Sequence, residues 1–345
     1  MKLPILVNAL SIIKLLLTIF PIWYMITSHM NNKLIKKIKR ALARWAYYFF
    51  FWFFSLLPLK FIFMISNGLL SIAYPFLIGM RSIAKESLTI AFSKEKSEDE
   101  IDRILRDCFF NLGRGFIEMF CYVQRPQLIL KKLHLTTGSL ENLEKAIKEN
   151  KGVVGVSAHF GNFSLMLLYL TKLGFSIHTI IRPSRDVLIE KSFQVQRSKM
   201  NFKTILSLPR YSCVRQSLMA LRKKEIVVVL MDQNTDEKSG VFVDFFGQKA
   251  GTPTGAVVFA MRTGSPILPM FTVRDGKDSH KIIIEPHFYL EIKPTEEETL
   301  QYNVQKITNI IESYIRQYPE EWGWMNRRWK NKPNSSTRQD KNPGS

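Results

Sequence analysis

Two long apolar stretches occupy the first eighty residues. Residues 3–26 are almost all apolar, interrupted by short polar side chains and Lys14. That run is long enough to cross a bilayer as a helix. A secretory signal is the alternative, but no clear small-x-small cleavage site precedes Met30, so we expect the run to be retained. The second stretch, residues 45–80, is rich in Phe, Tyr and Trp and suits the headgroup boundary, and the pattern leaves open whether it spans or lies in the interface.

A basic cluster lies between these stretches. Four of its side chains share one helical face by their spacing of three and four residues: Lys33, Lys36, Lys37 and Arg40. Basic residues beside a membrane segment favour the cytoplasmic side and anionic headgroups, although a solvated charged face is the alternative. We therefore predict that residues 1–80 anchor the chain to a membrane.

After residue 80 the spacing of the apolar residues changes twice. Residues 81–135 predict amphipathic helices, with a helix cap at Ser97 before three acidic residues. From about Leu140, short β-rich runs alternate with helical ones: VVGVSA, IHTII, KTIL, IVVVLM, VFVDFF, PILPMF and KIIIEP predict strands. This alternation predicts an α/β fold, a mixed sheet flanked by helices, as one domain over residues 81–330. Residues 331–345 are polar and predict a disordered tail.

The composition of the chain limits the classes of binding partner that we expect. The formal net charge of +20 indicates an anionic partner. Because no helix-turn-helix, zinc or RNA-binding signature is present, the apolar stretches favour a membrane over nucleic acid. Three scattered cysteines are too few for a disulfide framework, and the His, Cys and carboxylate spacings contain no metal-ligand set. We expect neither a metal nor a cofactor.

Polar residues follow three of the predicted strands. His159 comes after VVGVSA, Arg182 after IHTII, and Asp232 with Gln233 after IVVVLM. In open α/β sheets, functional groups gather beyond the carboxyl ends of the strands, so these side chains form a candidate polar site. A lone His after a strand is more often a capping or core residue, and the three polar strand ends together weaken that alternative.

Four segments resemble one protein family. They are RSIAKESLTIAF with FFNLGRGFIEMF, SAHFGNFSLM, the long block from MDQNTDEKSGVFVDFF to PILPMF, and the closing YPEEWGWMNRRWK. Together they resemble the late lipid A acyltransferases, the lauroyl and myristoyl transferases of lipopolysaccharide assembly, over about residues 45–332. The resemblance implies a glycerolipid-acyltransferase-like α/β fold on the cytoplasmic face of the bacterial inner membrane. It also implies an acyl carrier protein or coenzyme A thioester as the donor.

The resemblance gives the strand-end residues roles. His159 is expected to act as the general base that takes the proton of the acceptor hydroxyl. Arg182 is expected to stabilise the oxyanion or to bind a phosphate of the acceptor. In the family pattern, four residues separate the His from an Asp or Glu, whereas this chain has Ser164 at that position. Three interpretations stay open: Asp232 orients His159 instead, Ser164 suffices with a slower reaction, or the protein is a weakened or repurposed paralogue.

Three further features have two interpretations each. Gly161 is either a sharp turn into the following helix or an ordinary loop glycine, and Asn162 is either a helix N-cap or a substrate contact. The aromatic and basic residues of the closing segment 322–330 are either an interfacial anchor and phosphate-binding tail, or simple packing with a solvated end. Asn326 stands where the family usually has a His.

These observations predict a membrane-bound O-acyltransferase that acts on a lipid A precursor. We expect His159, Asp232 and Ser164 to be catalytic, and Arg182, Asn162, Gln233 and Gly161 to bind substrate. The first alternative is a same-fold enzyme with a different acceptor, such as a glycolipid or lysophospholipid. The second is a non-catalytic membrane-binding protein that has kept the fold.

Overall fold

A computed structural model describes residues 32–184, 186–236, 239–276 and 278–333. Its centre is a seven-stranded sheet in the order β1-β9-β8-β2-β5-β3-β4. The strands are β1 (Leu133–Leu135), β2 (Val153–Ser157), β3 (Ile177–Ile181), β4 (Lys203–Leu206), β5 (Ile226–Leu230), β8 (Ile267–Asp275) and β9 (Ser279–Ile284). The five strands from β8 to β4 run parallel, and β9 turns back antiparallel to β8. The prediction of an α/β fold around a mixed sheet is confirmed.

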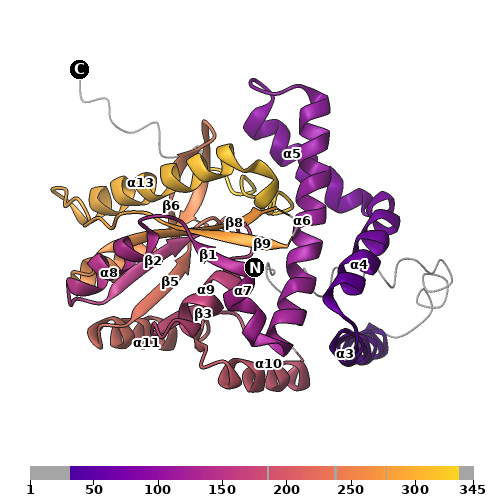
Figure 1. The fold of residues 1–345 in the computed structure, drawn as a ribbon. Helices are drawn as coiled ribbons and strands as arrows, with labels where there is room; N and C mark the ends of the chain where they lie inside the picture. Colours follow the sequence, from indigo (N-terminus) through magenta and orange to yellow (C-terminus); the bar gives the residue numbers. More distant parts are fainter. Residues whose placement is uncertain (1–31, 185, 237–238, 277, 334–345) are drawn as a thin grey trace.

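Helices cover both faces of the sheet (Figure 1). They are α5 (Ile78–Phe92), α6 (Glu98–Gln124), α7 (Ile129–Lys132), α8 (Ser139–Lys148), α9 (Phe163–Lys172), α10 (Val187–Lys199), α11 (Arg210–Arg222), α12 (Gly255–Thr263) and α13 (Glu296–Gln317). Figure 1 shows α13 lying across one face and α6 standing at one end of the sheet. Ser97 caps α6 in a capping box with Glu100, as the sequence predicts.

The central strands are buried on both faces, which explains their continuous apolar runs. Val154 and Val156 of β2 point into one hydrophobic cluster with α12 and α13. Val153, on the opposite face of the same strand, packs with α8 and α9 in a second cluster. Each such side chain contributes about 1.5–3 kcal/mol when fully buried, so the two clusters fix where the strand ends lie.

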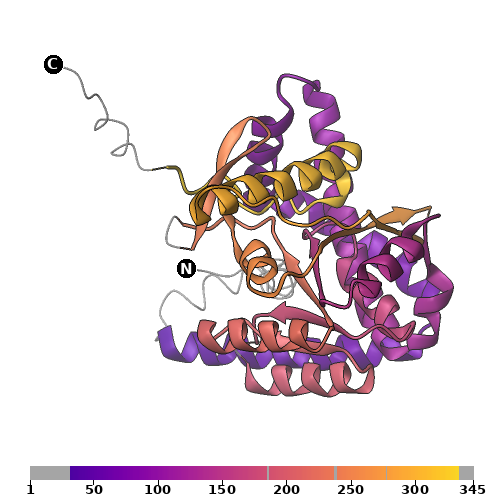
Figure 2. The same ribbon diagram turned by 90° about the vertical axis from the view of Figure 1, so that its left-hand side faces the viewer.

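One predicted strand lies outside the main sheet. VFVDFF forms β6 (Gly240–Phe245), which pairs with β7 (Gln248–Pro253) in a two-stranded antiparallel hairpin. Gln301 of α13 donates from its side-chain amide to the Phe242 carbonyl at 2.7 Å and so joins the hairpin to the helix. The hairpin stands beside α13 in Figure 2. The sequence pattern misses β1, which is three residues long, and β7, whose glycine and proline resemble a loop.

The aromatic stretch forms helices whose apolar side chains are largely exposed. They are α3 (Asn32–Leu56) and α4 (Leu59–Ala73), followed by η1 (Tyr74–Phe76), and the breaks coincide with Pro58 and Pro75. Tyr47 of α3 bonds Ser192 of α10 at 3.0 Å, which places α3 beside α10 (Figures 1 and 2). Among the described helices, none alone has the length and apolar character of a membrane span. Two consecutive helical segments, residues 60–76 and 78–92, together have the length and composition of a membrane span, and they are bent by 83° at the break between them.

Several expectations stay predictions. The apolar run 3–26 lies outside the described residues, and so does most of the polar tail, since the last described residue is Pro333. The division of the chain near residue 80 also stays a prediction, and that position falls within α5.

Candidate active site

The candidate site lies where three neighbouring parallel strands end. β2, β5 and β3 are adjacent in the sheet and run in the same direction, so their carboxyl ends share one edge. His159 follows β2 by two residues, Asp232 follows β5 by two, and Arg182 follows β3 directly. The three sequence-predicted residues therefore lie along the edge where open α/β sheets carry their chemistry, and His159 and Asp232 contact each other there.

His159 and Asp232 form a dyad. The ring Nδ1 of His159 lies 2.8 Å from Oδ1 of Asp232, and the backbone N–H of His159 donates to Oδ2 at 3.0 Å. An ionised carboxylate only accepts hydrogen bonds, so Nδ1 carries the proton and Nε2 carries the lone pair. This is the tautomer in which a histidine can act as a base through Nε2. The geometry agrees with the first of the three open interpretations, in which Asp232 orients His159.

Asp232 is buried, with 1% of its surface exposed. Burial alone would raise the pKa of its carboxyl, but the charge of His159 and hydrogen bonds from His159 and Trp322 outweigh burial and hold the pKa below its ordinary value. The indole Nε1–H of Trp322 donates to Oδ2 at 2.8 Å. Asp232 is therefore kept ionised by donors on two sides.

Gln233 contacts the face of the His159 ring. Its side-chain amide nitrogen lies 3.1 Å from Nε2 and 3.5 Å from Nδ1 of His159. A donor in line with the Nε2 lone pair would be much farther from Nδ1, so the amide lies over the ring and not along that lone pair. An acceptor hydroxyl must approach Nε2 in the plane of the ring before His159 can remove its proton, so Gln233 is a neighbour of the reacting oxygen.

The loop after His159 has little conformational freedom. Gly161 has φ +53°, and a Cβ there would lie 1.9 Å from the Thr272 carbonyl oxygen, so only glycine fits. Its backbone N–H donates to the Glu321 carbonyl at 2.8 Å. Gly161 is therefore a required sharp turn into α9 and not an ordinary loop glycine.

Asn162 is tied to α6. It precedes α9, yet its side chain makes no capping bond; its amide donates to the Gly115 carbonyl at 3.0 Å and to Glu118 at 3.1 Å. Asn162 therefore occupies the N-cap position of α9, but its side chain does not cap the helix. A substrate contact by Asn162 stays a prediction, and its buried amide is engaged with the protein.

A buried ionic cluster stands behind this loop. Glu118 accepts two bonds from Arg274, at 2.7 and 3.2 Å, and one from His280 Nε2 at 2.9 Å. Burial would raise the pKa of Glu118, but His280 and Arg274 lower it to about 2. Through Asn162, this carboxylate links α6 and the β8–β9 pair to the loop that presents His159.

Two predicted site residues stand apart from the dyad. Ser164 lies in α9, half-buried, and within the described residues it makes no hydrogen bond to His159. Arg182 is exposed at the end of β3 and forms no ion pair in the described part of the chain. Their roles stay predictions.

The described residues also contain no group of three or more His, Cys, Asp or Glu side chains that could hold a metal ion.

The closing segment contributes more than the sequence indicates. Trp322, Trp324 and Arg328 are fully buried, so the interpretation as an interfacial anchor or phosphate-binding tail is wrong for these three side chains. Arg328 donates to the Gly251 carbonyl at 2.6 Å and to the Thr252 hydroxyl at 2.5 Å in the hairpin. The sequence analysis missed Trp322 and Glu118 as neighbours of the site. The only sequence signal was that both lie in family-like blocks.

A comparison with protein-family models shows which family the chain belongs to. Residues 30–331 match the model of the bacterial lipid A biosynthesis acyltransferases. The chain belongs to this family. It is an acyltransferase, and family membership ties it to acyl transfer in lipid A or glycolipid biosynthesis, with a lipid acceptor and an acyl donor.

Individual relatives of this acyltransferase are distant. Its sequence is 27% identical to a lipid A biosynthesis palmitoleoyltransferase of Escherichia coli and 25% identical to a lauroyltransferase of the same organism, each over 82% of this chain and 89% of the relative. A phosphatidylinositol mannoside acyltransferase of Mycobacterium tuberculosis is 24% identical over 48% of this chain and 52% of its own.

Among solved structures, a 1-acyl-sn-glycerophosphate acyltransferase from Thermotoga maritima matches 69% of this chain and 96% of its own. The match has 12% identity and a TM-score of 0.34. A likeness this low supports no argument about the acyltransferase.

Proposed function

We propose that the protein is a membrane-bound O-acyltransferase that moves a fatty acyl chain from a thioester to a hydroxyl of a lipid A precursor. The observation that carries the proposal is the His159–Asp232 dyad at the carboxyl edge of the sheet, with Nε2 of His159 directed away from the carboxylate. Family membership supplies the reaction class, and the dyad supplies the base that the reaction requires.

The reaction proceeds in two balanced steps. Nε2 of His159 takes the proton of the acceptor hydroxyl. At the same time the hydroxyl oxygen attacks the thioester carbonyl carbon and forms a tetrahedral oxyanion. The carbon–sulfur bond then breaks, and the proton passes from the imidazolium to the departing thiolate. Asp232 stabilises the imidazolium throughout, as the carboxylate of a serine-protease triad does. These steps require a general base and a means of stabilising the oxyanion, and the proposal includes no metal or cofactor.

Arg182 is the residue proposed to handle negative charge. It is exposed at the end of β3, two strands from His159, and its planar fork suits a phosphate or an oxyanion. A phosphorylated acceptor docked there would present a hydroxyl toward the dyad. Gln233 is proposed to donate a hydrogen bond to the bound substrate.

An acidic acyl carrier protein is the proposed donor, with acyl-coenzyme A as the alternative. The supporting feature is α11, which contains no acidic residue and exposes Arg210, Arg215 and Arg222. Arg210 approaches Ser239, in the segment that follows Asp232, at 3.5 Å. A basic helix that begins beside the site would steer an acidic carrier toward the dyad.

Attachment to the bacterial inner membrane, with the catalytic edge on the cytoplasmic side, is the proposed location. Its support is the apolar surface of α3, α4 and α5, where many large side chains are exposed: Trp45, Tyr48, Phe49, Trp52, Leu56, Phe61, Met64, Leu69, Ile72, Phe76 and Ile78. Large apolar side chains exposed on successive helices are typical of a membrane or partner site. The basic residues around Lys36 favour an anionic leaflet.

A second acceptor has specific support. The relatives named phosphatidylinositol mannoside acyltransferases align over about half of this chain, so a different glycolipid hydroxyl is the alternative acceptor.

Lipid A from a deletion strain tests the proposal. Mass spectrometry should show one acyl chain missing, restored by the wild-type gene but not by the His159→Ala variant. The mass lost also gives the chain length. An unchanged lipid A together with a missing acyl chain on another glycolipid would favour the second acceptor. No change in any lipid would contradict both.

A further inference from the structure

The indole of Trp322 contacts the catalytic dyad from the side opposite His159. Its Nε1–H donates to Oδ2 of Asp232 at 2.8 Å, the same oxygen that accepts the backbone N–H of His159. Trp322 has no exposed surface. In this buried position the indole N–H has no water to replace Asp232 as its partner.

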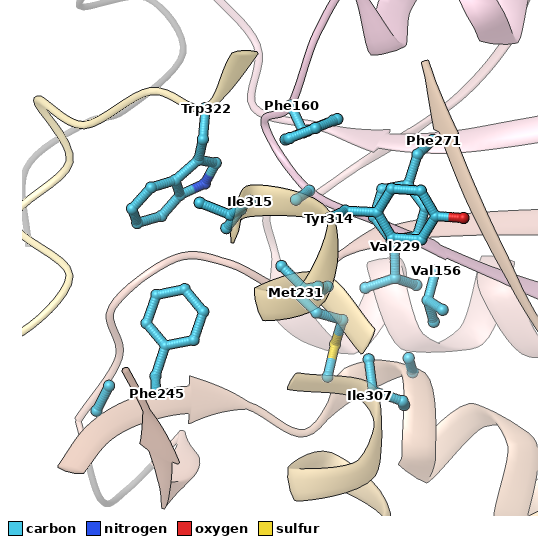
Figure 3. Close-up of a cluster of buried hydrophobic side chains, with 14 of the residues drawn as sticks. Val156, Phe160, Val229, Met231, Phe245, Phe271, Ile307, Tyr314, Ile315 and Trp322 are labelled. Carbon is cyan, nitrogen blue, oxygen red and sulfur yellow. The ribbon is translucent and has the colours of Figure 1, made fainter. Parts of the chain in front are cut away.

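The chain around Trp322 joins both loops of the site. Its backbone forms a β-bridge with Phe160, the residue after His159, and its carbonyl accepts the thiol hydrogen of Cys108 on α6 at 3.0 Å. Figure 3 shows Trp322 in one cluster with Phe160 and with Met231, the residue before Asp232. The indole is thus fixed relative to both halves of the dyad.

Arg328, in the same segment, holds the hairpin against this cluster. It is buried, its guanidinium lies 5.0 Å from the centre of the Phe245 ring, and it bonds a carbonyl and a hydroxyl of β7. Burial lowers the pKa of Arg328 to about 10, and the charge of Asp232 opposes that shift. The closing segment therefore reaches both the dyad, through Trp322, and the hairpin, through Arg328.

We propose that Trp322 is a positioning residue for the reaction, because its N–H fixes the orientation of the Asp232 carboxylate that aligns His159. This inference rests on the proposed function of the dyad. Asp232 follows a different strand from His159, and Ser164, which four residues separate from His159, does not bond the ring. The carboxylate therefore needs its own fixed donor, and Trp322 supplies it.

Trp324 offers a matched control. It is equally buried, its ring centroid is 4.7 Å from that of Trp322, and its Nε1–H donates to the Pro319 carbonyl and not to Asp232. Trp322→Phe and Trp324→Phe each remove one buried indole N–H from the same cluster. Only the first removes a bond to the dyad.

Turnover at saturating acceptor, measured across pH, separates the two variants. Trp322→Phe should lower kcat by about ten- to a hundredfold, the loss expected for a hydrogen bond to a charged group, with KM little changed. Loss of the donor raises the pKa of Asp232, so the acidic limb of the kcat profile should move to higher pH. Trp324→Phe should leave that limb in place. In an Asp232→Asn background, Trp322→Phe should cost nothing further.

¹⁵N NMR of the full-length protein in detergent tests the contact between Trp322 and Asp232 without any acyl transfer. The indole N–H resonance of Trp322 should shift in Asp232→Asn, and that of Trp324 should not. If the resonances behave this way but no thioester supports transfer, the proposed function fails and the contact stands. If Trp322→Phe does not fold, the wild-type and Asp232→Asn spectra still decide. Equal losses of kcat in both tryptophan variants with no movement of the acidic limb, or an unshifted Trp322 resonance, would overturn the proposal.

Discussion

Two pairs of tryptophans show how differently the two ends of this acyltransferase use the same side chain. Trp45 and Trp52 in α3 are 74% and 58% exposed, whereas Trp322 and Trp324 in the closing segment are fully buried. Both pairs lie in runs of aromatic and basic residues that look alike in the sequence. Their composition is that of an interfacial anchor in both cases.

The partners of the indoles explain the difference. Each buried indole has an acceptor within the chain, Asp232 for Trp322 and the Pro319 carbonyl for Trp324. The exposed pair belongs to a helix whose apolar face extends beyond the protein's own core. Aromatic residues near the dyad therefore hold polar groups in place, and those of α3 are available to a lipid surface.

The largest expected effect comes from removing the Asp232 carboxylate, to which the buried indole of Trp322 donates. Asp232→Asn should lower turnover by about 10³–10⁴-fold while the protein stays folded, because a neutral amide no longer fixes the ring tautomer or stabilises the imidazolium. Ser164→Ala should cost less than tenfold, since Ser164 makes no bond to His159. Initial rates at saturating acceptor and donor provide the measurement.

The reverse pattern would show that Ser164 is the partner of His159. In that case Ser164→Ala would be as damaging as His159→Ala, and Asp232→Asn would be mild. Circular dichroism of each variant serves as the control for folding.

Breaking the ionic cluster behind the site should lower stability. Glu118→Gln leaves Arg274 buried without its carboxylate, and loss of one partner from a buried ion pair costs about 3–5 kcal/mol. Thermal unfolding in detergent at neutral pH should show the loss. As a control, Lys85→Ala breaks the exposed pair with Asp102 and should change stability by less than about 1 kcal/mol.

The stability that Glu118 contributes should depend on pH in a defined direction. The folded-state pKa of about 2 lies below the ordinary value of 4.5, so the contribution is complete above about pH 5 and is lost as the pH falls toward 2. The difference in unfolding temperature between wild type and Glu118→Gln should therefore shrink across this acidic window. A difference that stays constant down to pH 3 would mean that the carboxylate is not the stabilising group.

Much of the fold was predictable because the central strands carry their own signal. Buried parallel strands such as β2 and β5 appear as unbroken apolar runs, and the strand-end rule then places His159 and Asp232 at one edge. The ionic cluster was not predictable, because Glu118 lies 156 residues before Arg274 and 162 before His280 in the chain. Nor does any local pattern tell a buried tryptophan that donates to a carboxylate from an exposed one such as Trp45.

Charge on the catalytic part should influence the donor step by a smaller factor. Transfer from an acyl carrier protein should slow severalfold as the salt concentration rises from about 0.05 to about 0.5 M, because screening weakens steering toward α11. Arg215→Gln with Arg222→Gln should reduce this salt response without changing transfer from acyl-coenzyme A. Rates of single-turnover transfer give the comparison, and an identical salt response with both donors would contradict a carrier-docking surface.

The smallest effect sharpens the tryptophan comparison itself. In vesicles that contain brominated lipid, the exposed indoles of α3 should be quenched and the buried pair should not. Replacing Trp45 and Trp52 by Phe should remove part of the quenchable emission, whereas Trp324→Phe should remove none. If the α3 variant keeps all of the quenchable emission, α3 does not face lipid.

Transfer of a labelled acyl chain by the purified protein tests the central claim most directly. Wild-type protein, mixed with an acyl thioester and a lipid A precursor, should form an ester on a precursor hydroxyl. The His159→Ala variant should do so about 10²–10⁴-fold more slowly, because the general base is missing. A His159→Ala protein as fast as the wild type would contradict the account.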